Sequence, residues 1–295
     1  MQDDPTSTLE LLALDRGVLR LASEDGSAVE WRSPLGTAVV ISSRGHGKRT
    51  NEDGVLVLQL DESRVLVAVA DGMGGLPDGD RAARLTLEAL AHELMRADRD
   101  ADLGAALATG FERANDAVID GAEGAGATLV AAVIGPATVR VVHAGDAEAL
   151  VVGQRGKLKL RTIAHSPTAA AHEAGLITER EAMMHAERHI VSNAIGLLPL
   201  TIEVGPEVPL GPRDTLVLGS DGLFDNLTLA EVVDAARCGP PKACATALAA
   251  FAWRRMDGVD GPRWPGKPDD LSLVVFRRVT PPTARSRRQA GANPA

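Results

Sequence analysis

Acidic residues stand at the ends of several strongly apolar segments of the sequence. One acid at a strand end is normally a cap or a turn residue, but five such positions in one chain are harder to explain in that way. Buried carboxylates repel one another unless a cation neutralises them, and oxygen ligands without Cys or clustered His suit Mg²⁺ or Mn²⁺. The five positions are Glu52-Asp53 before residues 54–60, Asp71-Gly72 after 65–70, Gly145-Asp146 after 139–144, Asp221 after 215–220, and Asp269-Asp270 before 271–276.

Such a cluster predicts metal-assisted hydrolysis of a phosphate ester. Two divalent ions about 4 Å apart lower the pKa of a bridging water, orient it and neutralise the phosphoryl oxygens, so that no covalent nucleophile is required. The sequence agrees, because it has no G-x-S-x-G motif and no plausible Cys/His pair around Cys238 or Cys244. Gly72 allows close backbone approach after Asp71, which makes its carbonyl a further candidate ligand.

Composition excludes other classes of function. Acids outnumber bases 40 to 31 among 295 residues, giving a formal net charge of −9 and a pI near 5.3. This balance argues against general nucleic-acid binding. Aromatic residues make up 2% of the chain and Tyr is absent, which leaves no stacking platform for single strands. The two cysteines are too few for a disulfide framework or a Cys-based zinc site.

The sequence shows no sign of a membrane or secretory segment. Residues 1–10 carry acids where a secretory signal needs positive charge, and no apolar region follows them. The longest uncharged run, residues 124–139, is interrupted by Gly135-Pro136 and falls short of the about 20 apolar residues of a spanning helix. We therefore expect no membrane interaction and, by default, a cytoplasmic protein.

Apolar periodicity predicts a chain of mixed α and β structure. Long helices lie between paired strands, and some strands are separated by only a turn, which favours antiparallel meanders over a regularly alternating parallel sheet. Strands are expected at 37–43, 54–60, 64–70, 127–134, 138–144, 147–152, 215–220 and 271–278, and helices at 80–95, 103–119, 168–174, 178–187, 228–237 and 241–255.

The chain is expected to contain one domain. No long linker divides residues 37–279, which would form the catalytic domain. Residues 1–36 would form an N-terminal extension, in which two short apolar runs around an Asp-Gly turn predict a β-hairpin over residues 18–32. Residues 280–295 lack core-forming side chains and are predicted to be a disordered tail.

Six short motifs around the acidic positions occur in a characteristic order. They are Lys48–Asp53 (similar to R-x-x-N-E-D), Asp71–Gly75 (identical to D-G-M-G-G), Gly126–Thr128 (G-x-T), His143–Asp146 (H-x-G-D), Gly219–Asp225 (S-D-G-L-x-D) and Lys267–Ser272 (D-[DN]-x-[ST]). In these motifs the chain resembles the metal-dependent serine/threonine protein phosphatases of type 2C, the PPM family, in their bacterial form. Any one motif is weakly specific, whereas six in order across about residues 37–279 are highly specific.

The resemblance implies an α+β fold, a four-layer α-β-β-α sandwich of two antiparallel sheets flanked by helices. It also implies two Mn²⁺ or Mg²⁺ ions. Carried over by position, Asp71 bridges both ions and the Gly72 carbonyl serves one of them. Asp221 and Asp269 complete the other site. A hydroxide that bridges the two ions would attack phosphorus in line.

The resemblance assigns further roles around the two ions. Glu52 and Asp53 act through metal-bound waters or as hydrogen-bond acceptors behind them, so that Asp53 counts both as a catalytic residue and as a metal residue. Asp146 matches a third, weaker metal position. Lys48 stands where the family has the Arg that binds the substrate phosphate, with Arg49 next to it. Lys cannot make the bidentate contact of Arg, so either Arg49 takes over through a local shift or phosphate binding is weaker.

Residues 156–196 resemble the family's flap, a segment beside the active site that is expected to influence substrate choice. The chain departs from the family pattern there and nearby, with Ala147-Glu148 in place of Ser-Arg, Ala164 in place of Asp and Asn193 in place of Arg. These changes affect the flap and the third metal position, and they leave the two-ion core intact.

The resemblance implies a phosphoserine/phosphothreonine protein phosphatase. Its partners would be phosphorylated proteins and a cognate Ser/Thr kinase or the targets of that kinase. Two alternatives are a catalytically weakened binding module with the same fold and a phosphatase for a small phosphorylated metabolite. The first reading is favoured, because a protein without activity has little reason to keep Asp71, Asp221 and Asp269 together.

Overall fold

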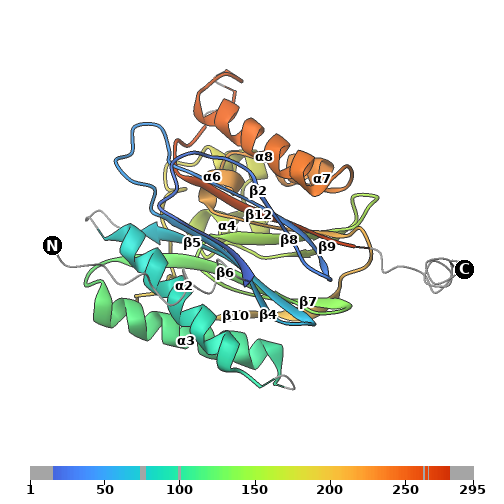
Figure 1. Ribbon diagram of the computed structural model, residues 1–295. Helices are drawn as coiled ribbons and strands as arrows, with labels where there is room; N and C mark the ends of the chain where they lie inside the picture. The colour runs from blue at the N-terminus through green and yellow to red at the C-terminus, as the bar shows by residue number, and fades with distance from the viewer. Residues whose placement is uncertain (1–15, 74–77, 99–100, 262, 265, 280–295) are drawn as a thin grey trace, which may run out of the picture.

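Two antiparallel six-stranded sheets pack face to face in the computed structural model of the chain (Figure 1). The structure describes residues 16–73, 78–98, 101–261, 263–264 and 266–279. In spatial order the first sheet contains β1 (Gly17–Leu21), β4 (Asp53–Asp61), β5 (Arg64–Met73), β6 (Gly126–Ile134), β7 (Thr138–Ala144) and β10 (Glu203–Pro209). The second contains β2 (Val29–Arg32), β3 (Gly36–Ser43), β12 (Leu271–Arg278), β11 (Thr215–Gly219), β8 (Glu148–Val152) and β9 (Leu158–Arg161).

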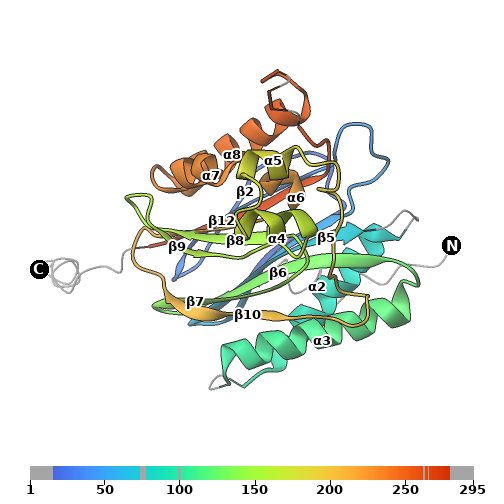
Figure 2. The same cartoon turned by 180° about the vertical axis from the view of Figure 1, so that it is seen from behind.

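Helices cover the outer face of each sheet. α2 (Gly79–Arg96) and α3 (Leu103–Gly121) pack on the first sheet, and α7 (Leu229–Ala236) and α8 (Pro241–Met256) pack on the second. This arrangement confirms the predicted four-layer sandwich. Figure 2 shows α4 (Pro167–Glu173) and α5 (Glu179–Met183) outside the four layers, on the side where β9 and β10 form the sheet edges. α6 (Asp221–Phe224) is a single turn that follows β11.

Strand β5 explains why the central strands are almost continuously apolar. Its side chains alternate between two separate cores: Val65, Val67 and Val69 face the space between the sheets, whereas Leu66 and Ala68 face the helices. Successive side chains of a strand point to opposite faces, and here both faces are buried. Because both faces of the strand are buried, charged side chains are found at the strand ends.

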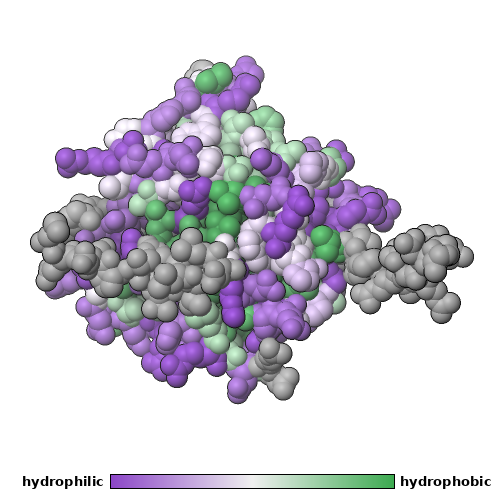
Figure 3. Space-filling model, viewed as in Figure 1, coloured by the Kyte–Doolittle hydropathy of each residue, from purple (hydrophilic) through white to green (hydrophobic). Residues whose placement is uncertain are grey.

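The α2–α3 layer is held by leucines at helical spacing. Leu87, Leu90 and Leu94 of α2 are fully or almost fully buried in one cluster with Phe111 of α3. Gly110 lets the two helices approach, since a Cβ atom at that position would lie 2.7 Å from Cδ1 of Leu90. On the molecular surface, hydrophilic residues cover most of the helical layers, and hydrophobic residues gather near the middle of this face (Figure 3).

The predicted hairpin over residues 18–32 is wrong. β1 pairs with β4 in the first sheet, and β2 pairs with β3 in the second. At these sheet edges the strands reach the two cores: Leu19 and Leu21 pack on one core, and Val18 and Trp31 on the other. The predictions of disorder at residues 1–8 and 280–295 lie outside the described residues.

The eight predicted strands and six predicted helices are confirmed, with ends that shift by up to a few residues. Strands β9 and β10 and the turn of helix α6 were not expected. Within the described ranges, no helix combines the length and the apolar composition needed to cross a membrane.

The buried α2–α3 interface gives a stability prediction. We expect Leu90→Ala to lower the free energy of unfolding by about 2–5 kcal/mol, because it leaves a cavity among fully buried side chains. Leu176→Ala is the matched control. Its side chain is 77% exposed, and we expect a change within about 0.5 kcal/mol. Urea denaturation of both variants measures the difference, and equal effects would contradict the packing described here.

Candidate metal centre

Antiparallel pairing brings the predicted acids to one end of the sandwich. Asp53 begins β4, and its register partner is Asp71 near the end of β5. In the second sheet, Asp221 lies two residues after the end of β11, and Asp269 lies two residues before the start of its neighbour β12. Asp146 lies in the turn between β7 and β8. Since the end of one antiparallel strand lies beside the beginning of the next, residues far apart in the sequence converge.

Asp53, which is buried, and Asp71, which is half-buried, lie at the centre of this cluster. Burial raises the pKa of Asp71 well above its usual value, and the charges of Asp53, Asp221 and Asp269 raise it further. Burial also raises the pKa of Asp53, with Asp270 as the largest neighbouring charge. These directions show that the carboxylates are close enough to repel one another and shielded from water.

Asp146, in the turn between β7 and β8, belongs to the same cluster. Burial, followed by the charges of Asp221 and Asp225, raises the pKa of Asp146 to about 8. The pKa of Asp225 is raised to about 6 by burial, which Lys267 opposes and Asp221 reinforces. Both pKa values lie above the ordinary range of aspartate, as burial beside like charges requires.

Lys48 lies inside the cluster, whereas Arg49 lies at its surface. The Lys48 ammonium contacts Oδ1 of Asp269 and lies 3.1 Å from Oδ2 of Asp270 and 3.8 Å from Oε2 of Glu52. Burial acts to lower the pKa of Lys48, but Asp269 and Asp270 outweigh it and raise that pKa above the usual value. Arg49 is exposed, and its backbone carbonyl accepts a hydrogen bond from Arg44.

The backbone at Gly72 is packed too tightly for any side chain. A Cβ atom there would lie 2.1 Å from the carbonyl oxygen of Gly79 and 2.7 Å from that of Glu52. The Gly72 N–H donates to the Glu52 carbonyl at 3.2 Å. The Glu52 carboxyl is also close to α2, since a Cβ on Gly79 would lie 2.5 Å from its Oε1. Burial raises the pKa of Glu52, and Lys48 opposes that shift.

Asp270 has a structural role that the sequence analysis did not assign. Its carboxylate accepts the backbone N–H groups of Gly45 at 2.7 Å and Glu52 at 2.9 Å, and it contacts Lys48. These bonds tie the loop between β3 and β4 to the beginning of β12. The sequence shows two adjacent acids at this position. Only the folded structure distinguishes the role of Asp270 from that of Asp269.

Asp225 and Lys267 were also missed. The Lys267 ammonium contacts Oδ2 of Asp221 and lies 2.9 Å from Oδ2 of Asp225 and 3.5 Å from Oδ2 of Asp269. Asp225 closes the S-D-G-L-x-D motif, which could have pointed to it. Lys267 belongs to no residue pattern that indicates a role in a metal centre.

Two buried oxygen atoms in the cluster have no hydrogen-bond donor. Among the described residues, Oδ1 of Asp53 and Oδ1 of Asp221 are buried without a partner. Their companion atoms are satisfied, since Ser220 donates to Oδ2 of Asp53 at 2.9 Å and Lys267 contacts Oδ2 of Asp221. An unpaired buried carboxylate oxygen is costly unless a cation meets it. These oxygen ligands therefore fit hard divalent ions such as Mn²⁺ or Mg²⁺.

Comparison with known proteins decides the family. A sequence model described as "Protein phosphatase 2C" matches residues 42–254. This chain belongs to the protein phosphatase 2C family. The serine/threonine phosphatase stp of Listeria welshimeri is 30% identical over 206 residues, which cover 65% of this chain and 80% of that protein.

Solved structures of protein phosphatase 2C relatives share the fold. The serine/threonine phosphatase PstP/Ppp of Mycobacterium tuberculosis superposes with a TM-score of 0.69 at 26% identity, covering 82% of this chain and 98% of that one. A structure of the PstP catalytic domain in complex with two manganese ions gives a TM-score of 0.66 at 26% identity, with the same coverage. The matched family region ends before Asp269, so the structure alone places that motif in the cluster.

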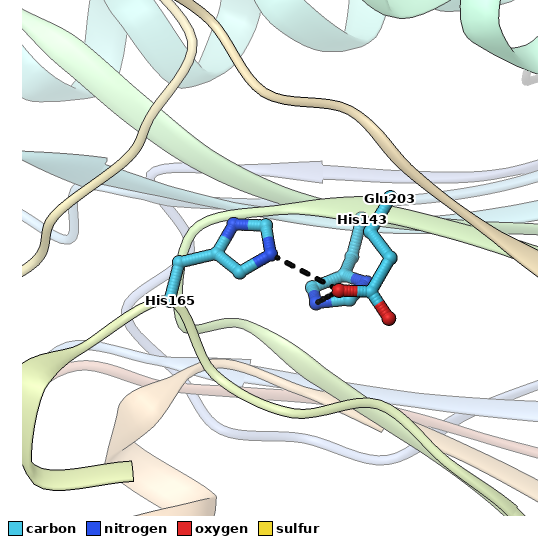
Figure 4. Close-up of side chains that lie close together, drawn as sticks. All are labelled: His143, His165 and Glu203. Carbon is cyan, nitrogen blue, oxygen red and sulfur yellow. Dashed lines mark hydrogen bonds and ion pairs between the residues drawn. The ribbon is translucent and has the colours of Figure 1, made fainter. Parts of the chain in front are cut away.

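Two histidines and a glutamate form a second group of potential metal ligands beside the phosphatase 2C acids (Figure 4). Their geometry indicates hydrogen bonds instead. Nε2 of His143 lies 2.9 Å from the Ile163 carbonyl, which can only accept, so this nitrogen carries a proton. Nδ1 of His165 accepts the Gly145 N–H at 3.1 Å, so in the neutral ring Nε2 carries the proton and points at Glu203, 3.4 Å away.

The orientation of Asn193 supports this assignment. Its Oδ1 accepts from the Thr201 N–H, so its Nδ2 is the atom that faces Nδ1 of His165 at 2.7 Å. Neither histidine Nε2 then offers a lone pair to a metal. The group instead fastens residues 163–193 to the turn that carries Asp146, because the His165 N–H also donates to the Gly145 carbonyl.

The raised pKa values predict how metal and pH affect stability. An acid such as Asp146, with a folded pKa of about 8 against an ordinary 3.8, binds more protons in the folded state than in the unfolded state between those values. Stability of the metal-free protein therefore falls as pH rises from about 4 to about 8. We expect Mn²⁺ to raise the melting temperature more at pH 8 than at pH 5.

Thermal unfolding with Mn²⁺ and with a chelator, at both pH values, measures this effect. Asp120→Asn, at an exposed position of α3, should respond as the unaltered protein does. A Mn²⁺ effect that is equal or smaller at pH 8 would contradict the assignment of mutually repelling carboxylates.

Proposed function

We propose that this chain hydrolyses phosphoserine and phosphothreonine on proteins in a reaction that requires two divalent ions, Mn²⁺ or Mg²⁺. The observation that carries the proposal is the convergence of buried aspartates with two oxygen atoms that lack any donor, on Asp53 and Asp221. Membership of the protein phosphatase 2C family and the serine/threonine phosphatases among its relatives support it. The two-manganese structure of a relative supports the number of ions.

Three carboxylates and one backbone carbonyl would hold the ions. Asp71 would contribute to holding both ions, Asp221 and Asp269 would complete one site, and the Gly72 carbonyl would serve the other. Bound divalent ions would supply charge neutralisation of the phosphoryl group and activation of water. Asp53 supports this arrangement from behind, where Ser220 fixes its orientation.

Lys48 orients the substrate phosphate. Its ammonium is held at the mouth of the cluster by Asp269, Asp270 and Glu52, and its side chain keeps 33% exposure. A phosphoryl oxygen can therefore reach it from solvent. Arg49 contributes to the approach of the anionic substrate from the surface, which is a long-range role and not a bidentate contact.

Of the alternatives, a weakened binding module gains no support from the site, because the carboxylates that bind metal converge. The partners would be phosphorylated proteins and a cognate kinase or its targets. Exposed apolar side chains in the flap, such as Leu176 and Met184, suit a polypeptide substrate better than a small metabolite. The cytoplasmic location stays a prediction, and the third ion that the resemblance implies at Asp146 is not part of this proposal.

Removal of one metal residue tests the proposed function. We expect Asp221→Asn to lower the rate of phosphate release from a phosphothreonine peptide and from an aryl phosphate by on the order of 100-fold or more, since even supporting residues of metal sites contribute 10–100-fold. A chelator should abolish release by the unaltered protein, and Mn²⁺ should restore it. Asp120→Asn is the control. Equal rates of phosphate release with Mn²⁺, with chelator and by Asp221→Asn would contradict the proposal.

A second prediction concerns Lys48. We expect Lys48→Ala to raise KM more than it lowers kcat, because the ammonium binds the phosphate of the ground state and of the transition state alike. Lys48→Arg keeps the charge and should recover most of the lost kcat/KM. Steady-state kinetics on the phosphothreonine peptide separate the two constants. A fall in kcat at constant KM would show that Lys48 acts chiefly in the transition state.

A further inference from the structure

Lys267 places a positive charge among three carboxylates of the centre. Its ammonium contacts Asp221 and lies 2.9 Å from Oδ2 of Asp225 and 3.5 Å from Oδ2 of Asp269. The side chain of Lys267 is only 15% exposed, and those of its three partners are 13–25% exposed. Lys267 is therefore a largely buried positive charge within the cluster. A surface ion pair, by contrast, would contribute little to stability.

The backbone of Lys267 is fixed by a buried side chain. The amide of Asn226, which is 1% exposed, accepts the Lys267 N–H at 2.8 Å and donates to the Lys267 carbonyl at 3.0 Å. Asn226 also donates to the Gly222 carbonyl, in the helical turn that begins with Asp221. One amide thus holds the lysine and its first carboxylate partner in a set relative position.

The loop before Lys267 is anchored as well. The ring of Trp264 lies against the guanidinium groups of Arg255, 4.1 Å from the ring centre, and Arg180, 4.7 Å away. Arg255 is in turn held by Glu231 and Asp260. The approach of Lys267 to the acids is therefore built into the packing of the loop.

The two oxygen atoms of Asp221 have different surroundings. Oδ2 contacts the Lys267 ammonium, whereas Oδ1 is buried without any partner. Asp225 likewise has its Oδ2 on the lysine. Asp146, in the turn between β7 and β8, faces the same corner: burial raises its pKa, the charges of Asp221 and Asp225 raise it further, and the charge of Lys267 opposes them. One side of Asp221 is thus open to a metal ion, and the other already faces a cation.

We propose that the ammonium of Lys267 is the resident cation of the corner formed by Asp146, Asp221 and Asp225, so that this corner excludes a divalent ion. The chain then binds two divalent ions at saturation and not three. The inference rests on the proposed two-ion function and refines it. A fixed ammonium in contact with Asp221 and Asp225 repels a divalent ion from that corner and occupies the space it would need.

Counting bound Mn²⁺ tests the proposal. We expect equilibrium dialysis of the full chain at saturating Mn²⁺, followed by elemental analysis, to give two ions for the unaltered protein. Lys267→Gln should bind three, because the corner loses its ammonium and keeps its carboxylates. Lys267→Arg should bind two. Lys242→Gln removes an exposed lysine of α8 with the same change in charge, and it should also bind two.

A double variant locates the additional ion. Adding Asp146→Asn to Lys267→Gln should return the count to two, if the third ion sits at the corner named here. A count of three in that double variant would overturn the location. Circular dichroism establishes that each variant is folded before its ions are counted.

The outcomes separate the two claims. Three ions on the unaltered protein would overturn the role of Lys267 without any variant, as would two ions on folded Lys267→Gln. Either result would leave the proposed phosphatase function in place. Fewer than two ions on the unaltered protein would instead contradict the two-ion centre, and with it the proposed function.

Discussion

The mutual repulsion of buried carboxylates is the constraint on which this structure depends. Asp53 and Asp71 are register partners on adjacent strands, and both have pKa values raised well above those of ordinary aspartates. Such an arrangement is unfavourable by itself and persists because the two sheets hold it from behind. The continuous apolar strands, the α2–α3 layer and the α7–α8 layer supply the burial that fixes the strand ends in place. Divalent ions and two lysines then supply the opposite charge that the cluster requires.

The two lysines approach different oxygen atoms of Asp269 and differ in their surroundings. Lys48 is one-third exposed, so a phosphate can reach it from solvent. Lys267 is more deeply buried and its backbone is held by Asn226, which suits a permanent charge. In the roles we propose, the same residue type binds substrate at one place and sets the number of metal ions at the other. Burial and backbone restraint, and not the chemistry of the side chain, distinguish the two roles.

Much of the fold, and the position of the acids at strand ends, could be predicted from the sequence, because both depend on local patterns. Apolar runs such as residues 65–70 followed directly by Asp71 mark a buried strand and its end. The hairpin at 18–32 was predicted wrongly, since a local turn signal says nothing about competing sheet edges. Strands β9 and β10 were missed because one has only four residues and the other contains Gly and Pro. Lys267 and the separate roles of Asp269 and Asp270 depend on tertiary contacts, which no spacing in the sequence encodes.

Proton release on metal binding tests the central claim most directly. If buried carboxylates hold protons because they repel one another, divalent ions must displace those protons when they bind. Calorimetric titration of the full chain with Mn²⁺ at pH 7, in buffers of different ionisation enthalpy, measures the number released. We expect a net release of protons at pH 7, since burial and neighbouring charges hold the pKa values of Asp53 and Asp71 well above their usual value. Mn²⁺ binding that releases no protons at pH 7 would contradict the claim.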